Sequence, residues 1–94
     1  MKKPILFLLD DDPQVLRAIN RDIKAQYRDQ YRVMSTDSPS DGLEALTELK
    51  KKNEVVALFL VDQRMPEMMG VEFLEKAKKY YPDAKKILNI RFRS

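Results

Sequence analysis

The sequence predicts an α/β fold, a doubly wound parallel sheet of four strands with three helices on its two faces. Short continuous apolar runs, such as 5–9 and 55–61, are typical of strands buried on both sides. Between them lie segments whose apolar residues recur at helical spacing. The resulting alternation of strands and helices favours parallel strands joined by right-handed crossovers.

The first half of the chain contains two predicted strand–helix units. After the strand Ile5–Leu9, Asp12 and Pro13 are typical of a helix start, with an N-cap followed by a proline. A second strand is expected over Tyr31–Thr36, and the pair Ser38-Pro39 repeats the same helix start. Apolar residues at helical spacing mark the two helices: Val15, Leu16, Ile19, Ile23 and Tyr27 in the first, and Leu43, Leu46 and Leu49 in the second.

The second half is predicted to hold two strands and one helix. The run Val55–Val61 is rich in β-branched residues and indicates a central strand. A loop over Asp62–Gly70 leads to a helix over Val71–Tyr81, which the Pro82-Asp83 step ends. The last strand is expected over Lys86–Arg93.

Composition restricts the chemistry and the setting of the protein. The 94 residues, expected to form one domain over 1–94, include neither cysteine nor histidine. Disulfides, zinc sites built on thiolates or imidazoles, and Ser-His-Asp triads are therefore excluded. No apolar run approaches the about 20 residues of a membrane-spanning helix, so we expect a cytoplasmic location and no membrane partner. The formal charge is +3, but no nucleic-acid-binding motif is present, and direct binding to nucleic acid is not expected.

Acidic residues follow two of the predicted strands at the point where each strand ends. Asp10, Asp11 and Asp12 follow the first strand, and Asp62 follows the third. Ligands of such sheets bind beyond the carboxyl ends of the strands, where Asp10, Asp11 and Asp62 converge if the two strands are neighbours. Clustered carboxylate oxygens suit a hard divalent cation such as Mg²⁺. The alternative is that these acids are ordinary turn residues, with Asp12 acting only as a helix cap.

Two segments together resemble a known family. The segment VDQRMPEMMG, residues 61–70, resembles the phosphoacceptor segment of response-regulator receiver domains. The segment FLLDDDP, residues 7–13, resembles the acidic pocket at the end of that family's first strand. The resemblance covers about residues 3–88 and implies a flavodoxin-like receiver fold. It also implies a phosphoacceptor function in two-component, or phosphorelay, signal transduction.

The resemblance implies roles for individual residues. Asp62 matches the aspartate that accepts the phosphoryl group, so the domain would signal rather than act as an enzyme. Asp11 matches the acid that binds Mg²⁺ directly, and Asp10 the neighbour that holds it through water. Asp62 and the backbone carbonyl of Arg64 complete the implied metal site. The implied donor is a histidine kinase or a phosphotransfer protein.

The loop after the acceptor also follows the family. Pro66 and Gly70 match the turn residues that shape it. Met65, Met68 and Met69 are expected to pack this loop rather than to bind a ligand.

The sequence departs from the family after about residue 88. The usual receiver has a fifth strand and two further helices, which are absent from the 94 residues. The position of the family's switch Ser or Thr falls on Ile90, and the fifth-strand lysine has no counterpart. Residues 89–94 are therefore interpreted as an atypical tail, and a truncation or a reading-frame change near residue 89 is one hypothesis. We expect impaired phosphorylation and a largely lost conformational output.

The tail predicts an open sheet edge. Its residues alternate between apolar and polar, which is typical of a strand with one wet face. An unpaired fourth strand invites pairing with another copy, so a homodimer through this edge is expected. The alternating residues are Leu88, Ile90 and Phe92 against Asn89, Arg91 and Arg93.

Two other functions stay open at this point. The chain is interpreted alternatively as a degenerate, truncated receiver that acts as a protein-interaction module without phosphorylation. The D-x-D pattern of Asp10 and Asp12 also occurs in aspartate-nucleophile phosphatases. That third interpretation is disfavoured, because the chain is too short for the remaining motifs and Asp12 suits a helix cap.

Overall fold

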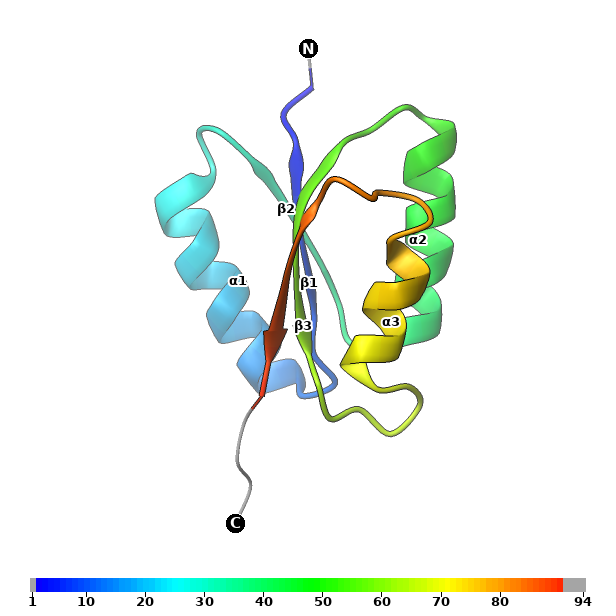
Figure 1. Cartoon of the computed structure of the whole chain (residues 1–94). Coiled ribbons are helices and arrows are strands. Elements are labelled where there is room, and N and C mark those ends of the chain that lie inside the picture. The colour runs from blue at the N-terminus through cyan, green and yellow to red at the C-terminus, as the bar shows by residue number, and fades with distance from the viewer. Residues whose placement is uncertain (1, 91–94) are drawn as a thin grey trace.

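The computed structural model describes residues 2–90, which form one parallel sheet with the strand order β2-β1-β3-β4. Helix α1 covers one face of the sheet, and helices α2 and α3 cover the other (Figure 1). The predicted doubly wound α/β fold is therefore confirmed. Along the chain the elements are β1 (Ile5–Leu9), α1 (Pro13–Tyr27), β2 (Arg32–Thr36), α2 (Pro39–Lys51), β3 (Val56–Asp62), α3 (Gly70–Ala77) and β4 (Lys85–Asn89).

Both predicted helix starts are present. Asp12 is the N-cap of α1, and Ser38 is the N-cap of α2, where its hydroxyl accepts a hydrogen bond from the backbone N–H of Asp41 at 3.2 Å. A proline follows each cap, where its missing N–H costs no helical hydrogen bond. None of the helices within residues 2–90 combines the length and the apolar character that crossing a membrane requires.

The predicted end of the last helix is wrong, and so is the prediction that Ile90 belongs to the last strand. The helix expected over Val71–Tyr81 stops at Ala77, and the next residues turn through hydrogen bonds three residues apart, such as Tyr80 N–H to Ala77 carbonyl at 3.0 Å. Strand β4 stops at Asn89, and the rest of the predicted tail strand beyond Ile90 lies outside the described residues. Ile90 lies past the strand with 61% of its surface exposed, so it is not part of a buried apolar face.

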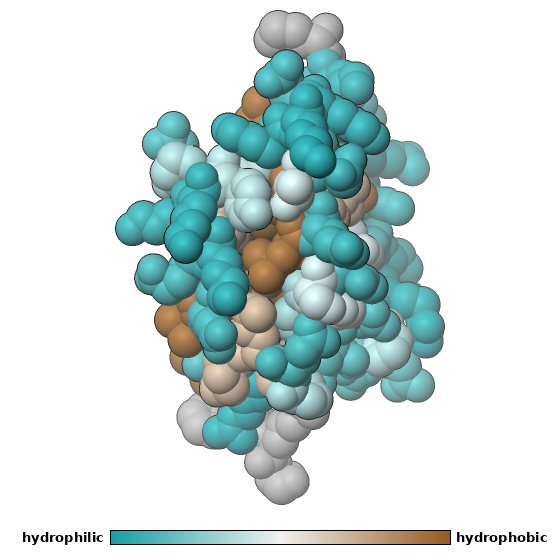
Figure 2. Space-filling model, turned by 90° about the vertical axis from the view of Figure 1, so that its right-hand side faces the viewer, coloured by the Kyte–Doolittle hydropathy of each residue, from teal (hydrophilic) through white to brown (hydrophobic). Residues whose placement is uncertain are grey.

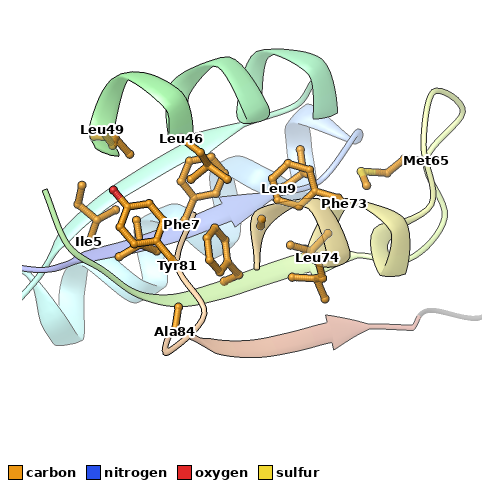
Figure 3. Packing of buried hydrophobic residues seen from close by; sticks show 14 residues of the cluster. Ile5, Phe7, Leu9, Leu46, Leu49, Met65, Phe73, Leu74, Tyr81 and Ala84 are labelled. Carbon is orange, nitrogen blue, oxygen red and sulfur yellow. The ribbon is translucent and has the colours of Figure 1, made fainter. Parts of the chain in front are cut away.

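The main core lies between the sheet and the α2–α3 layer (Figure 3). The rings of Phe7 on β1, Phe59 on β3 and Phe73 on α3 are fully buried, with centroids 5.5 to 6.3 Å apart. Aromatic rings at this separation gain attraction beyond the area that they bury. Figure 2 shows the outer side of this layer, where hydrophilic side chains surround a narrow hydrophobic area. This packing fixes β1 and β3 beside each other, which is the pairing that the site requires.

An ion-pair cluster ties together the opposite end of the sheet. The carboxylate of Glu54, just before β3, is nearly buried and accepts two hydrogen bonds from the Arg32 guanidinium, at 2.6 and 3.2 Å. The Lys2 ammonium adds a third bond at 3.2 Å. The hydrogen bonds from Arg32 are the main reason that the pKa of Glu54 lies below its usual range. The backbone carbonyl of Glu54 also accepts the hydroxyl of Tyr81 at 2.8 Å.

We expect Glu54→Gln to destabilise the fold at neutral pH and to do so less in acid. The folded-state pKa of Glu54 is depressed, so its stabilisation is present above the unfolded-state pKa and disappears as the pH falls through the folded value. Urea unfolding of both proteins at pH 7 and pH 3 measures the difference in free energy of unfolding. The exposed Glu48, changed to Gln, is the control and is expected to have little effect. A difference for Glu54→Gln that stays constant with pH would contradict this account.

Candidate functional site

Three carboxylates meet at the carboxyl edge of the sheet, where β1 and β3 lie side by side. Asp10 and Asp11 follow β1 directly, and Asp62 is the last residue of β3. One carboxylate oxygen of each residue lies within 4.8 Å of those of the other two. Asp10 and Asp62 are each only 3% exposed, and Asp11 is half-buried. The structure thus brings together the three acids that the sequence predicts to converge.

Asp12, the next acid of the run, belongs to the helix rather than to the cluster. Its carboxylate accepts hydrogen bonds from the backbone N–H groups of Gln14 at 3.0 Å and Val15 at 3.4 Å. Its own N–H donates to the Asp10 carboxylate at 2.9 Å, which orients that carboxylate at the rim. The engagement of Asp12 as an N-cap counts against the phosphatase interpretation, in which it would act beside Asp10.

The electrostatics of the cluster favour a divalent cation. Two unit charges about 4 Å apart repel by about 4 kcal/mol at an effective dielectric constant of about 20. Mg²⁺ binds carboxylate oxygens, and a bound cation turns this repulsion into attraction. Asp10, Asp11 and Asp62 therefore make a donor set that fits Mg²⁺. Arg64, whose carbonyl is the expected further ligand, lies two residues beyond Asp62 with an exposed side chain.

Gln63 holds the end of β3 against two neighbouring elements. Its backbone N–H donates to the carbonyl of Asn89 at the end of β4, at 3.0 Å. Its carbonyl and its side-chain oxygen accept the N–H groups of Gly70 and Val71, each at 3.0 Å, at the start of α3. The N-cap of that helix, Met69, provides no side-chain bond. The role of Gln63 is not predictable from the sequence, because a capping residue seven positions before a helix leaves no local pattern.

The rest of the loop is anchored by burial and by one carboxylate. Met65 is 5% exposed and Met68 packs against the core, as predicted. Met69 is 44% exposed, so the prediction that it packs the loop is wrong. The Glu67 carboxylate accepts the backbone N–H of Ser40 in the first turn of α2 at 3.0 Å, where the helix dipole favours a negative charge.

Gly70 is required by a close approach of two chain segments. A Cβ atom at this position would collide with the backbone carbonyl of Asp62 and would lie 2.7 Å from the Cδ1 atom of Leu88. A side chain would therefore displace either Asp62 or β4. The predicted role of Gly70 in shaping the loop thus has a steric reason. It does not depend on a left-handed backbone conformation, because the φ angle of Gly70 is not positive.

Asn89 lies beside the cluster, in a place that the sequence analysis did not predict. The interpretation of residues 89–94 as an atypical tail gives Asn89 no role in the site. In the structure Asn89 is the last residue of β4 and pairs directly with Asp62. The register of two parallel strands depends on packing along their whole length, so no local pattern indicates this pairing.

Comparison with known proteins assigns the family. The family model for the response regulator receiver domain matches residues 6–90. This chain belongs to that family. Membership implies a phosphoacceptor role in two-component signalling. A receiver is a signalling domain and not a typical enzyme.

Individual relatives agree with this assignment. The hydrogenase transcriptional regulatory protein HoxA of Cupriavidus necator is 26% identical over 87 residues, which are 93% of this chain and 16% of that protein. A CheY-like receiver domain structure from Methanospirillum hungatei is 29% identical, with a TM-score of 0.79 over 99% of this chain and 68% of the other. A receiver domain structure from Clostridium thermocellum, at 23% identity, supports the fold, with a TM-score of 0.77 over 93% of this chain and 64% of the other.

Proposed function

We propose that Asp62 is the phosphoacceptor of this receiver and that Asp10, Asp11 and Asp62, with the backbone carbonyl of Arg64, hold Mg²⁺. The convergence of three carboxylates within 4.8 Å carries this proposal. The site stands at the carboxyl ends of neighbouring strands, where sheets of this class bind ligands. The half-buried Asp11 leaves the cluster in contact with solvent at the rim.

The proposed transfer needs no general base. The ionised Asp62 carboxylate attacks phosphorus, an O–P bond forms, and the P–N bond of a phosphohistidine donor breaks as its imidazole nitrogen takes up a proton. Bound Mg²⁺ would supply charge neutralisation between the carboxylates and the phosphoryl oxygens. The absence of histidine from this chain is therefore no obstacle, because the histidine belongs to the donor. A histidine kinase or a phosphotransfer protein is the proposed donor.

Incubation with acetyl phosphate and Mg²⁺, followed by intact mass, tests the acceptor. We expect one phosphoryl adduct on the wild type and none on Asp62→Asn, because the amide cannot attack phosphorus. The control Asp41→Asn changes an exposed acid in the first turn of α2 and is expected to keep the adduct. If the wild type gives no adduct, the degenerate interaction module replaces the phosphoacceptor as the proposed function.

We expect the adduct to form slowly and to change the conformation little. Ile90 stands at the position that the family gives to a hydroxyl donor, and an aliphatic side chain cannot bond a phosphoryl oxygen. The phosphorylated aspartate adds about −1.5 to −2 charges, by analogy with other phosphorylated side chains. This added charge can transmit a signal only if it shifts the equilibrium of a structural element between two conformations.

We also propose that β4 mediates a homodimer. Within residues 2–90 the strand pairs only with β3, and Ile87 on it is 47% exposed. Beside it, on the α1 face, lies an apolar cavity of about 730 Å³ that Leu6, Leu58, Leu60 and Ile87 help to line. Open edges of this kind pair readily with another copy.

Light scattering of the 94-residue chain over a range of concentrations tests the dimer. We expect a mass above that of one chain at high concentration, and a return to one chain in Ile87→Lys, which places a charge on the edge strand. Val71→Lys, at a position 50% exposed on α3, is the matched control and is expected to keep the wild-type mass. A wild type that stays monomeric at every concentration contradicts the proposal.

A further inference from the structure

Asn89 occupies a defined position beside the proposed acceptor. The β3–β4 register places it directly opposite Asp62. The backbone carbonyl of Asn89 accepts a hydrogen bond from the Gln63 N–H at 3.0 Å. Side chains two residues apart on a strand share a face, so Asn89 lies on the same side of β4 as Ile87. Because Asp62 pairs with Asn89, the two side chains lie on the same face of the sheet, which is the face that α1 covers.

A small cavity beneath the site brings three polar residues together. Asp10, Asp62 and Asn89 line it from β1, β3 and β4. The remaining lining consists of leucine and isoleucine side chains from β1, β3 and α1. Asn89 therefore lies in an otherwise apolar wall whose other polar groups are two nearly buried carboxylates.

The chemistry of these groups is complementary. An ionised carboxylate only accepts hydrogen bonds, whereas an asparagine amide offers two N–H donors. A polar group in an apolar wall gains most by bonding to a polar neighbour. Hydrogen bonds to charged groups are also stronger than bonds between neutral groups.

We propose that Asn89 is a positioning residue of the acceptor site, whose side-chain amide donates a hydrogen bond to the Asp62 carboxylate from the α1 face. This bond would hold one oxygen of Asp62 toward the cavity and present the other at the rim, where the phosphoryl donor arrives. Asn89 thus acts through Asp62 and does not bind the metal. The proposal rests on the phosphoacceptor function of Asp62.

The test compares Asn89→Leu with the wild type. Leucine nearly matches asparagine in shape and suits the apolar wall, but it removes the proposed donor to the Asp62 carboxylate, so we expect a moderate fall in the free energy of unfolding. We expect the maximal rate of phosphorylation by acetyl phosphate, followed by intact mass, to fall by about tenfold or more, which is the effect of losing a hydrogen bond to a charged group. The half-saturating acetyl phosphate concentration should stay unchanged. Asn89→Gln, which keeps the amide on a longer arm, should recover part of the rate.

Mg²⁺ titration of the unphosphorylated proteins provides an independent readout. Asn89→Leu should bind Mg²⁺ as the wild type does, because Asn89 is not a ligand. Asn20→Leu is the matched control. The Asn20 amide donates a hydrogen bond to the Ser35 hydroxyl at 2.7 Å, and neither residue belongs to the carboxylate cluster, so this variant should keep the wild-type rate. A wild-type rate in Asn89→Leu, or a rate loss matched by weaker Mg²⁺ binding, overturns the proposal. A wild type that forms no adduct at all instead overturns the phosphoacceptor function itself.

Discussion

The mutual repulsion of three carboxylates is the constraint on which the rest of this structure depends. Asp10, Asp11 and Asp62 have oxygens within 4.8 Å of one another, two of the three residues are almost fully buried, and the fold must hold them there. The aromatic core on the α2–α3 face keeps β1 and β3 paired, and Asp12 caps α1 instead of joining the cluster. A cation at the rim would relieve the remaining repulsion. The same three negative charges therefore destabilise the fold and make the proposed Mg²⁺ site.

The loop that follows Asp62 holds this edge of the sheet in place through contacts with the neighbouring elements. Gln63 bonds to both β4 and α3, Glu67 bonds to the first turn of α2, and Gly70 allows the helix to approach the end of β3. These contacts join the loop to three different elements, so a movement of this loop would also displace the starts of α2 and α3. The proposed phosphoryl group would add its charge at the point where these contacts meet.

The sequence predicted those parts of the molecule that local patterns determine. The apolar strands, the N-caps at Asp12 and Ser38 and the convergence of the acids all follow from periodicity and from the rule that parallel strands end at one edge. The end of α3 was predicted too late, because apolar residues at helical spacing continue through the turns to Tyr80. The positions of Gln63 and Asn89 depend on register and on long-range packing, which a single sequence does not display.

Urea unfolding of the wild type and Asp11→Asn, in EDTA and in increasing Mg²⁺, tests the central claim most directly. In EDTA the variant should be more stable than the wild type, because one of the three repelling charges is removed. In Mg²⁺ the wild type should gain stability with concentration, as binding to the folded state requires, and the variant should gain little. A variant that is less stable in EDTA, or an equal response of both proteins to Mg²⁺, would contradict the account.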